Sequence, residues 1–111
     1  MSPTTTLIEL AKSRRTYYML GNTCIVPFSK IEELVNNAIL HIPSSFNTQS
    51  CRLVVLIHED HTRLWDLAID IFGEQVRSGR MSKDQWENRT RPKLERLKAA
   101  YGTVLASFLF F

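Results

Sequence analysis

The sequence predicts an α+β fold of the α/β sandwich type, in which helices flank a sheet. A short, continuous run of apolar and β-branched residues, 53–57, is typical of a strand covered on both faces. Amphipathic segments on either side of this run have helical spacing. The predicted order is helix, helix, strand, helix, helix, strand, which favours a sheet covered by helices. With 111 residues, the chain is long enough for one modest domain.

The first predicted helix spans Thr4–Lys12, with Thr5 or Thr6 as its N-cap and Leu7 and Leu10 on one side. An aromatic segment, 17–20, follows, and the Gly-Asn pair at 21–22 is typical of a turn.

The second predicted helix begins with Ser29 and Glu32, which have the spacing of a capping box. Pro43 is expected to prevent its continuation, because the residue before a proline avoids the helical region. The apolar residues between them recur at helical spacing: Ile31, Leu34, Val35, Ala38 and Ile39.

The strand Leu53–Ile57 is predicted to be an interior strand, against which the helices around 31–39 and 64–72 pack. Asp60 is expected to cap the third helix, whose apolar residues extend from Leu64 to Val76. The predicted third helix therefore follows the strand closely.

Ser82 and Gln85 form another predicted capping box. Pro92 is expected in the first turn of a last helix that carries Leu94, Leu97 and Ala100. Gly102 is expected to end that helix, and an apolar strand is predicted from Thr103 to Phe111.

Composition and charge favour a globular protein without a nucleic-acid-binding face. The chain is 44% hydrophobic, and its formal net charge of +3 is dispersed among acidic residues. Cys24 and Cys51 have neither metal-binding nor CxxC spacing, so two reduced thiols are expected.

The N-terminus is not typical of a signal peptide, and no segment has the ~20 apolar residues of a membrane span. We expect a cytoplasmic location, with the nucleus as an alternative.

The histidines near the predicted strand end do not indicate metal or hydrolytic chemistry. His58 and His61, with Glu59 and Asp60 between them, are interpreted as a solvated turn in which Asp60 acts as a cap. We expect no metal. The sequence contains no nucleophile elbow, Walker loop or dinucleotide-binding glycine motif.

Two polar segments are candidates for ligand binding. In the first, Ser13–Thr16, paired guanidinium groups and a hydroxyl suit a phosphate. Positive charge complementing the end of a helix is the alternative explanation. In the second, Pro43–Arg52, compact hydroxyl and amide groups precede a strand and suit the polar edge of a flat heterocycle. An ordinary helix-to-strand loop is the alternative there.

In combination, these segments resemble the nitroreductase family. The motifs S-R-R-T-x-Y and P-S-S-F-N-x-Q-S, followed by the strand R-L-V-V-L, are most similar to its fungal and bacterial nitroreductase-like subgroup. The similarity continues through L-W-D, D-Q-W and A-Y-G-T-V-L, and so covers nearly the whole chain.

The resemblance implies a homodimer that binds FMN at its interface. Arg14, Arg15 and Thr16 would hold the FMN phosphate and ribityl group. The residues expected to reach the isoalloxazine ring from the partner subunit are Pro43, Ser44, Ser45, Asn47 and Gln49. We therefore expect Arg14 and Arg15 to face the pocket lined by the 43–49 loop, within one chain or across a dimer axis.

The implied activity is hydride transfer from NAD(P)H, through the flavin, to a nitro compound or quinone. The flavin carries this chemistry, so no catalytic side chain is expected.

Members of the family continue well beyond the Y-G-T-V-L segment. By resemblance, residues 1–111 therefore form a nitroreductase-like domain that is only the N-terminal part and is incomplete at its C-terminus. The alternative function is that of a truncated, non-catalytic fragment that associates with a full-length copy. The apolar segment 103–111 is expected to make the chain oligomeric or prone to aggregation, and removal of residues 106–111 is expected to improve solubility.

Overall fold

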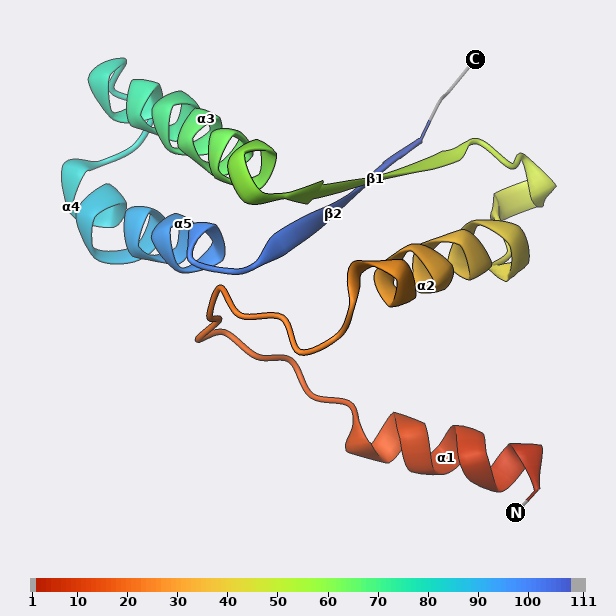
Figure 1. Ribbon diagram of the computed structural model, residues 1–111. Coiled ribbons are helices and arrows are strands. Elements are labelled where there is room, and N and C mark those ends of the chain that lie inside the picture. The colour runs from red at the N-terminus through yellow and green to blue at the C-terminus, as the bar shows by residue number, and fades with distance from the viewer. Residues whose placement is uncertain (1, 109–111) are drawn as a thin grey trace.

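The computed structural model describes residues 2–108 and confirms the predicted α+β class (Figure 1). The regular elements, in chain order, are α1 (Pro3–Ser13), α2 (Phe28–His41), β1 (Cys51–Ile57), α3 (His58–Arg77), α4 (Lys83–Gln85), α5 (Arg91–Lys98) and β2 (Gly102–Phe108). A short 3₁₀ turn, Ser45–Asn47, precedes β1, and a π-helical turn, Trp86–Thr90, connects α4 to α5.

The two strands form an antiparallel sheet in which Ile57 pairs with Gly102 and Cys51 pairs with Phe108. The prediction of an interior strand was wrong for the part of the chain that the structure describes. There, β1 pairs with β2 alone, and Val54 is 46% exposed. An apolar run predicts that a strand forms, but it does not determine how many strands pair with it.

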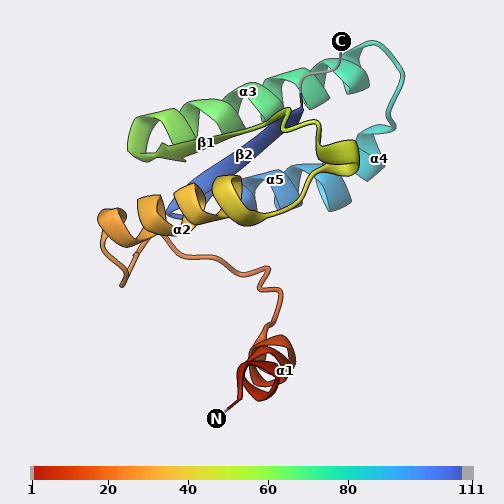
Figure 2. The ribbon, with the colours of Figure 1, turned by 90° about the vertical axis from the view of Figure 1, so that its right-hand side faces the viewer.

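Helices α2 and α3 pack against opposite faces of this sheet, as Figure 2 shows. Val55 and Ile57 share one face with Ile31 of α2, around a common hollow. Leu56 points to the other face, beside Leu64 of α3. The expected packing of both helices against the sheet is therefore confirmed. One strand can contact a helix on each face because its successive side chains point to opposite sides.

The best-buried side chains of residues 2–108 lie where α3, the π-helical turn and α5 meet. They are His61, Trp86 and Leu94, and His61 is the most buried of them, with an exposure of 2%. The core of the described chain is thus small and lies at one end of the sheet (Figure 1).

A hydrogen-bonded network ties this core to the sheet. His61 Nδ1 lies 2.9 Å from Thr103 Oγ1, and His61 Nε2 lies 3.0 Å from the Lys98 carbonyl oxygen. Trp65 Nε1 donates to the same threonine hydroxyl over 2.9 Å. We call His61, Trp65, Lys98 and Thr103 the His61 network. It joins α3, the end of α5 and the start of β2.

Two predicted helix starts were wrong by a few residues. Ser2, rather than Thr5 or Thr6, caps α1, and its hydroxyl accepts a bond from the Thr5 amide over 3.1 Å. Helix α2 begins at Phe28, directly after Pro27, so Ser29 lies inside the helix and caps nothing. The fixed φ of Pro27 favours the extended backbone that precedes the first turn.

Helix α3 also begins earlier than predicted. It starts at His58, immediately after β1, and Asp60 lies in its first turn with no capping hydrogen bond. A carboxylate in that position still favours the helix, because it complements the positive N-terminal end of the dipole. By contrast, Ser82 is confirmed as the cap of α4, since its hydroxyl accepts a bond from the Gln85 amide. Pro43 follows the end of α2, as expected.

The C-terminal boundaries differ from the prediction at the last helix. Pro92 lies in the first turn of α5, as expected, but α5 ends at Lys98 and Gly102 begins β2 instead of ending a helix. A Cβ at Gly102 would lie 2.8 Å from the Leu56 carbonyl oxygen, so glycine is required for the close approach of the two strands. Residues 109–111 of the predicted final strand lie outside the described residues.

The described chain is extended. Its radius of gyration is 17.7 Å, whereas a compact domain of this length has a radius of about 13 Å. Helix α1 lies away from the sheet in both views (Figures 1 and 2). Many large apolar side chains of α1 and α2 are exposed, among them Leu7, Leu10 and Leu34. This shape leaves surface that favours association with another chain.

Truncation of a core leucine should distinguish the small core from the exposed helices. Leu94 is 7% exposed and Leu34 is 62% exposed. We expect Leu94→Ala to lower the free energy of unfolding by about 2–4 kcal/mol. Leu34→Ala, the matched control, should cost less than about 1 kcal/mol. Urea unfolding measures both, and an equal loss in the two variants would show that α2 is covered in solution.

The exposed end of β2 should promote association. Phe108 is 57% exposed on a strand with one partner in the described chain, so Phe108→Lys should reduce self-association. Phe46→Lys is the matched control, since Phe46 is fully exposed but lies in a loop. Sedimentation velocity measures the size distribution. Equal distributions for wild type and Phe108→Lys would contradict the assignment of association to β2.

Candidate functional site

A polar hollow of about 480 Å³ lies between the end of α2 and the start of β1. Four of the predicted site residues line it: Pro43, Ser44, Asn47 and Gln49. Arg52, the second residue of β1, contributes a positive charge to the same wall. The polar segment singled out in the sequence thus borders a concave surface.

The backbone of this loop is unusual. Phe46, Asn47 and Gln49 have φ angles of 54°, 54° and 52°, in the left-handed region. Such a conformation costs about 1–3 kcal/mol for a residue other than glycine, and residues in it concentrate at ligand-binding sites. Asparagine adopts it most readily, whereas a phenylalanine there is exceptional.

Local hydrogen bonds hold the loop in this shape. Ser44 Oγ accepts a bond from the Gln49 amide over 3.0 Å, and the Ser44 carbonyl accepts one from the Asn47 amide over 3.0 Å. The Gln49 side-chain amide donates to Asn47 Oδ1 over 3.4 Å. Both the side chain and the backbone carbonyl of Ser44 therefore accept hydrogen bonds that hold the loop closed.

Ser45 differs from the other predicted loop residues. It begins the 3₁₀ turn, its carbonyl accepts a bond from the Thr48 amide over 3.2 Å, and its side chain does not line the hollow. The adjacent Phe46 side chain is fully exposed. Neither of these two residues lines the hollow that their neighbours border.

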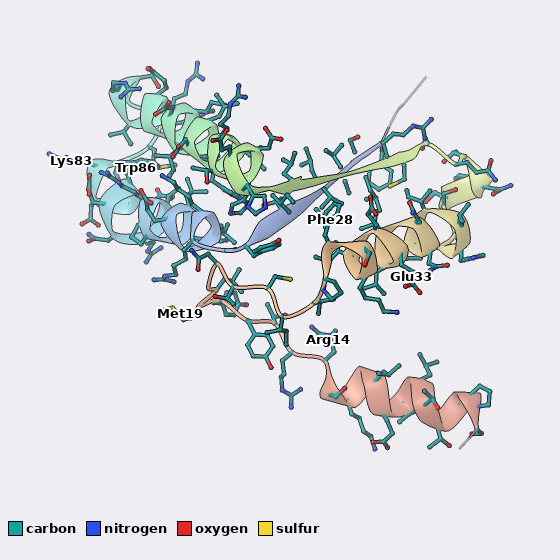
Figure 3. All side chains as sticks on the ribbon, in the orientation of Figure 1. Arg14, Met19, Phe28, Glu33, Lys83 and Trp86 are labelled. Atoms are coloured by element: carbon teal, nitrogen blue, oxygen red, sulfur yellow. The ribbon has the colours of Figure 1, made fainter. Side chains whose placement is uncertain are left out.

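The predicted phosphate-binding residues lie just after α1, and Figure 3 labels Arg14 there. Arg14 Nη1 donates to Thr16 Oγ1 over 3.3 Å, which places a guanidinium group and a hydroxyl side by side. Arg15 Nη1 donates to the backbone carbonyl oxygens of Lys12 and Arg14. All three predicted residues are exposed, and neither arginine pairs with a carboxylate within the described residues.

A single copy of the chain does not bring the two predicted segments together. The residues that line the hollow beside the 43–49 loop do not include Arg14, Arg15 or Thr16. Figure 3 shows Arg14 near the end of α1, whereas the loop follows the far end of α2. The two segments therefore do not line one hollow within a single chain, and the expectation that they face the same pocket stays a prediction for the arrangement across a dimer axis.

A second hollow, of about 640 Å³, lies beside the His61 network, which the sequence interpretation missed. The segment from His58 to His61 was interpreted as a solvated turn. His58, Glu59 and Asp60 are exposed as expected, but the interpretation was wrong for His61, which is nearly fully buried in the first turn of α3. His58 packs edge-on against Tyr101, with ring centroids 5.9 Å apart. The signal that was overlooked is the spacing of His61 and Trp65, four residues apart and therefore on one face of a helix.

An ion pair lies next to this network. Lys98 Nζ lies 2.6 Å from Asp66 Oδ1 and so links α5 to α3. The hydrogen bond to Asp66, followed by the attraction of its charge, raises the pKa of Lys98 above its ordinary value. The ammonium group therefore stays charged at neutral pH.

Among residues 2–108, no group of three or more histidine, cysteine, aspartate and glutamate side chains is arranged to hold a metal ion. Cys24 and Cys51 are free thiols, as expected. No helix in the same part of the chain is both long and apolar enough to cross a membrane.

The described chain is thus an α+β chain in which a polar loop with a left-handed backbone lines a hollow at the start of a strand. A model of the nitroreductase family matches residues 11–109. Because the match spans most of the sequence, the chain belongs to the nitroreductase family, which is a family of oxidoreductases.

Solved structures of nitroreductases are similar in sequence and fold. CinD from Lactococcus lactis, in complex with chloramphenicol, is 28% identical with a TM-score of 0.65; the match covers 90% of this chain and 46% of that one. A nitroreductase from Saccharomyces cerevisiae is 26% identical with a TM-score of 0.68; the match covers 96% of this chain and 54% of that one.

The chain is also 32% identical to HBN1 of Saccharomyces cerevisiae, a protein named as a candidate nitroreductase. That similarity extends over 68 residues, which are 60% of this chain and 35% of HBN1. The chain spans about half the length of the solved structures that it matches.

The loop geometry predicts different roles for two adjacent serines. Ser44→Ala removes the acceptor of the Gln49 amide, so exchange of that amide with solvent should accelerate at least several-fold. Ser45→Ala is the matched control and should leave the exchange rate unchanged, because Ser45 bonds to the Thr48 amide through its backbone carbonyl, which the substitution keeps. Hydrogen exchange followed by NMR measures both. Equal rates in wild type and Ser44→Ala would show that the serine hydroxyl does not close the loop.

Proposed function

We propose that this chain serves an FMN-dependent oxidoreductase that uses NAD(P)H to reduce nitro compounds or quinones. The observation that carries the proposal is the strained loop 43–49, which lines a polar hollow in a member of the nitroreductase family. A backbone held in the left-handed region at three residues is costly, and such a cost is tolerated where a ligand requires the shape.

The donor chemistry near the N-terminus fits the phosphate of FMN. Arg14, Arg15 and Thr16 offer exposed guanidinium and hydroxyl donors within a few residues of one another. A guanidinium group binds two phosphate oxygens at once, and a hydroxyl provides a third donor. No carboxylate within the described residues neutralises either arginine.

The loop chemistry fits the edge of the flavin ring. A ring of this kind presents carbonyl oxygens and ring nitrogens, which pair with amide and hydroxyl groups. Ser44, Asn47 and Gln49 supply such groups around the hollow, and Pro43 and Ser45 frame the turn. When bound, FMN supplies the two-electron chemistry, and the residues of this chain bind and orient it.

We propose that a complete site requires two copies of the chain. The phosphate-binding residues follow α1, whereas the loop lies beyond the far end of α2, so each copy would contribute one half. The exposed apolar residues of α1 and α2 support this arrangement, because they offer the surface that a partner subunit would cover.

The substrates proposed for this chain follow from its relatives. Solved structures of CinD contain chloramphenicol and 4-nitrophenol. Both are nitroaromatic compounds, so a nitroaromatic or quinone acceptor is proposed here as well. The two free thiols suit the reducing conditions of the cytoplasm or nucleus.

A second candidate function is that of a non-catalytic partner that associates with a full-length copy. The chain spans about half of its solved relatives and has a small core with much exposed apolar surface. The visible absorption spectrum separates the two functions. A yellow protein with one FMN per chain supports the oxidoreductase, whereas a colourless protein that binds a full-length relative supports the association.

The phosphate assignment can be tested by replacing one arginine. Arg15→Ala should weaken FMN binding at least tenfold, because a charge-assisted hydrogen bond is lost, while stability changes little. Arg80→Ala, an exposed arginine away from both segments, is the matched control. Flavin fluorescence titration measures affinity, and urea unfolding measures stability. Equal FMN affinities for wild type and Arg15→Ala would rule out the phosphate role.

A further inference from the structure

The backbone of Gln49 is held from both sides by side chains. Its amide donates to Ser44 Oγ over 3.0 Å, and its carbonyl oxygen accepts a bond from Arg52 Nη1 over 3.3 Å. Gln49 has a φ of 52°, a left-handed conformation that is uncommon for residues other than glycine. We call these two bonds the Gln49 clamp. The clamp fixes the peptide groups on either side of Gln49 and so holds the left-handed turn in place.

Arg52 reaches back across the junction between the loop and β1. Its Nη1 atom carries two protons, and the second bond goes to the Cys51 carbonyl oxygen over 3.0 Å. Because a guanidinium group is planar and rigid, the two bonds also fix its orientation. Within residues 2–108, Arg52 makes no other hydrogen bond and pairs with no carboxylate. Its remaining N–H donors are therefore available to a ligand.

The hollow beside the loop has a positive wall. Arg52 lines it together with Ser44, Asn47 and Gln49, and no aspartate or glutamate is among the residues that border it. Arginine stays charged at any pH that a folded protein tolerates. The charge of Arg52 is thus not neutralised at this surface, which favours a ligand whose edge is electron-rich or negatively charged.

We propose that Arg52 is a positioning residue of this site, which holds the loop through the Gln49 carbonyl and supplies positive charge to the bound flavin. The inference rests on the proposed function, since it takes FMN as the ligand. Reduction of a flavin by two electrons and one proton leaves one added negative charge on the ring. Positive charge in the wall therefore favours reduced over oxidised FMN and raises its midpoint potential.

Hydrogen exchange of the flavin-free chain tests the clamp. Arg52→Met keeps a long side chain but removes the donors and the charge. Exchange of the Gln49 amide should accelerate at least several-fold in this variant, because the loop opens more often. Arg80→Met, which changes an exposed arginine away from the loop, is the matched control and should exchange like the wild type. Equal rates in wild type and Arg52→Met would overturn the clamp.

A reductive titration of the FMN-bound protein against a reference dye tests the role of the charge. Arg52→Met should shift the balance between the two states at least tenfold towards oxidised FMN, which lowers the two-electron midpoint potential by about 30 mV. Arg52→Lys should retain most of the wild-type potential, because the ammonium group keeps the charge. Arg80→Met should match the wild type.

The outcomes of this titration separate the inference from the proposed function. A wild-type chain that binds no FMN would contradict the proposed function and, with it, the role of Arg52 towards the flavin. The exchange experiment needs no flavin and would still decide the clamp. A wild type that binds FMN, with a potential equal to that of Arg52→Met, would overturn the inference and leave the proposed function in place.

Discussion

The hydrogen bonds of the His61 network are the constraint on which the rest of the described fold depends. The sheet has two strands in residues 2–108, and an isolated pair of antiparallel strands is marginal in water without a packed helix. The network supplies the attachment, since it joins α3 and the end of α5 to Thr103 at the start of β2. Trp86 and Leu94 then fill the space between the helices.

The N-terminal half of the described chain is organised differently. Helix α2 contacts the sheet through Ile31, but its outer face and the whole of α1 remain exposed. An isolated helix of eleven residues is marginally stable in water, so packing against a surface outside this chain would stabilise α1. The candidate phosphate-binding residues follow α1 directly, which links occupancy of the site to the placement of that helix.

The sequence predicted the kind of each element better than its ends and its partners. The apolar run 53–57 predicted a strand because strand formation depends on local residue types, but pairing depends on distant ones. Ser82 was predicted as a cap because its partner lies three residues away, whereas Ser29 has the same pattern and caps nothing. His61 was missed because its burial depends on Thr103 and Lys98, about forty residues later in the chain. The loop 43–49 was predicted from its residue types, but its left-handed backbone was not.

The junction between β1 and α3 has a consequence for how this chain tolerates changes in length. The strand ends at Ile57 and the helix begins at His58, which makes the turn with a φ of 53°. One inserted residue would rotate α3 by about 100° and carry His61 away from Thr103. The exposed turn at 78–80 connects the same helix to the next without this coupling. Natural variation in length should therefore accumulate at that turn and be absent from the junction.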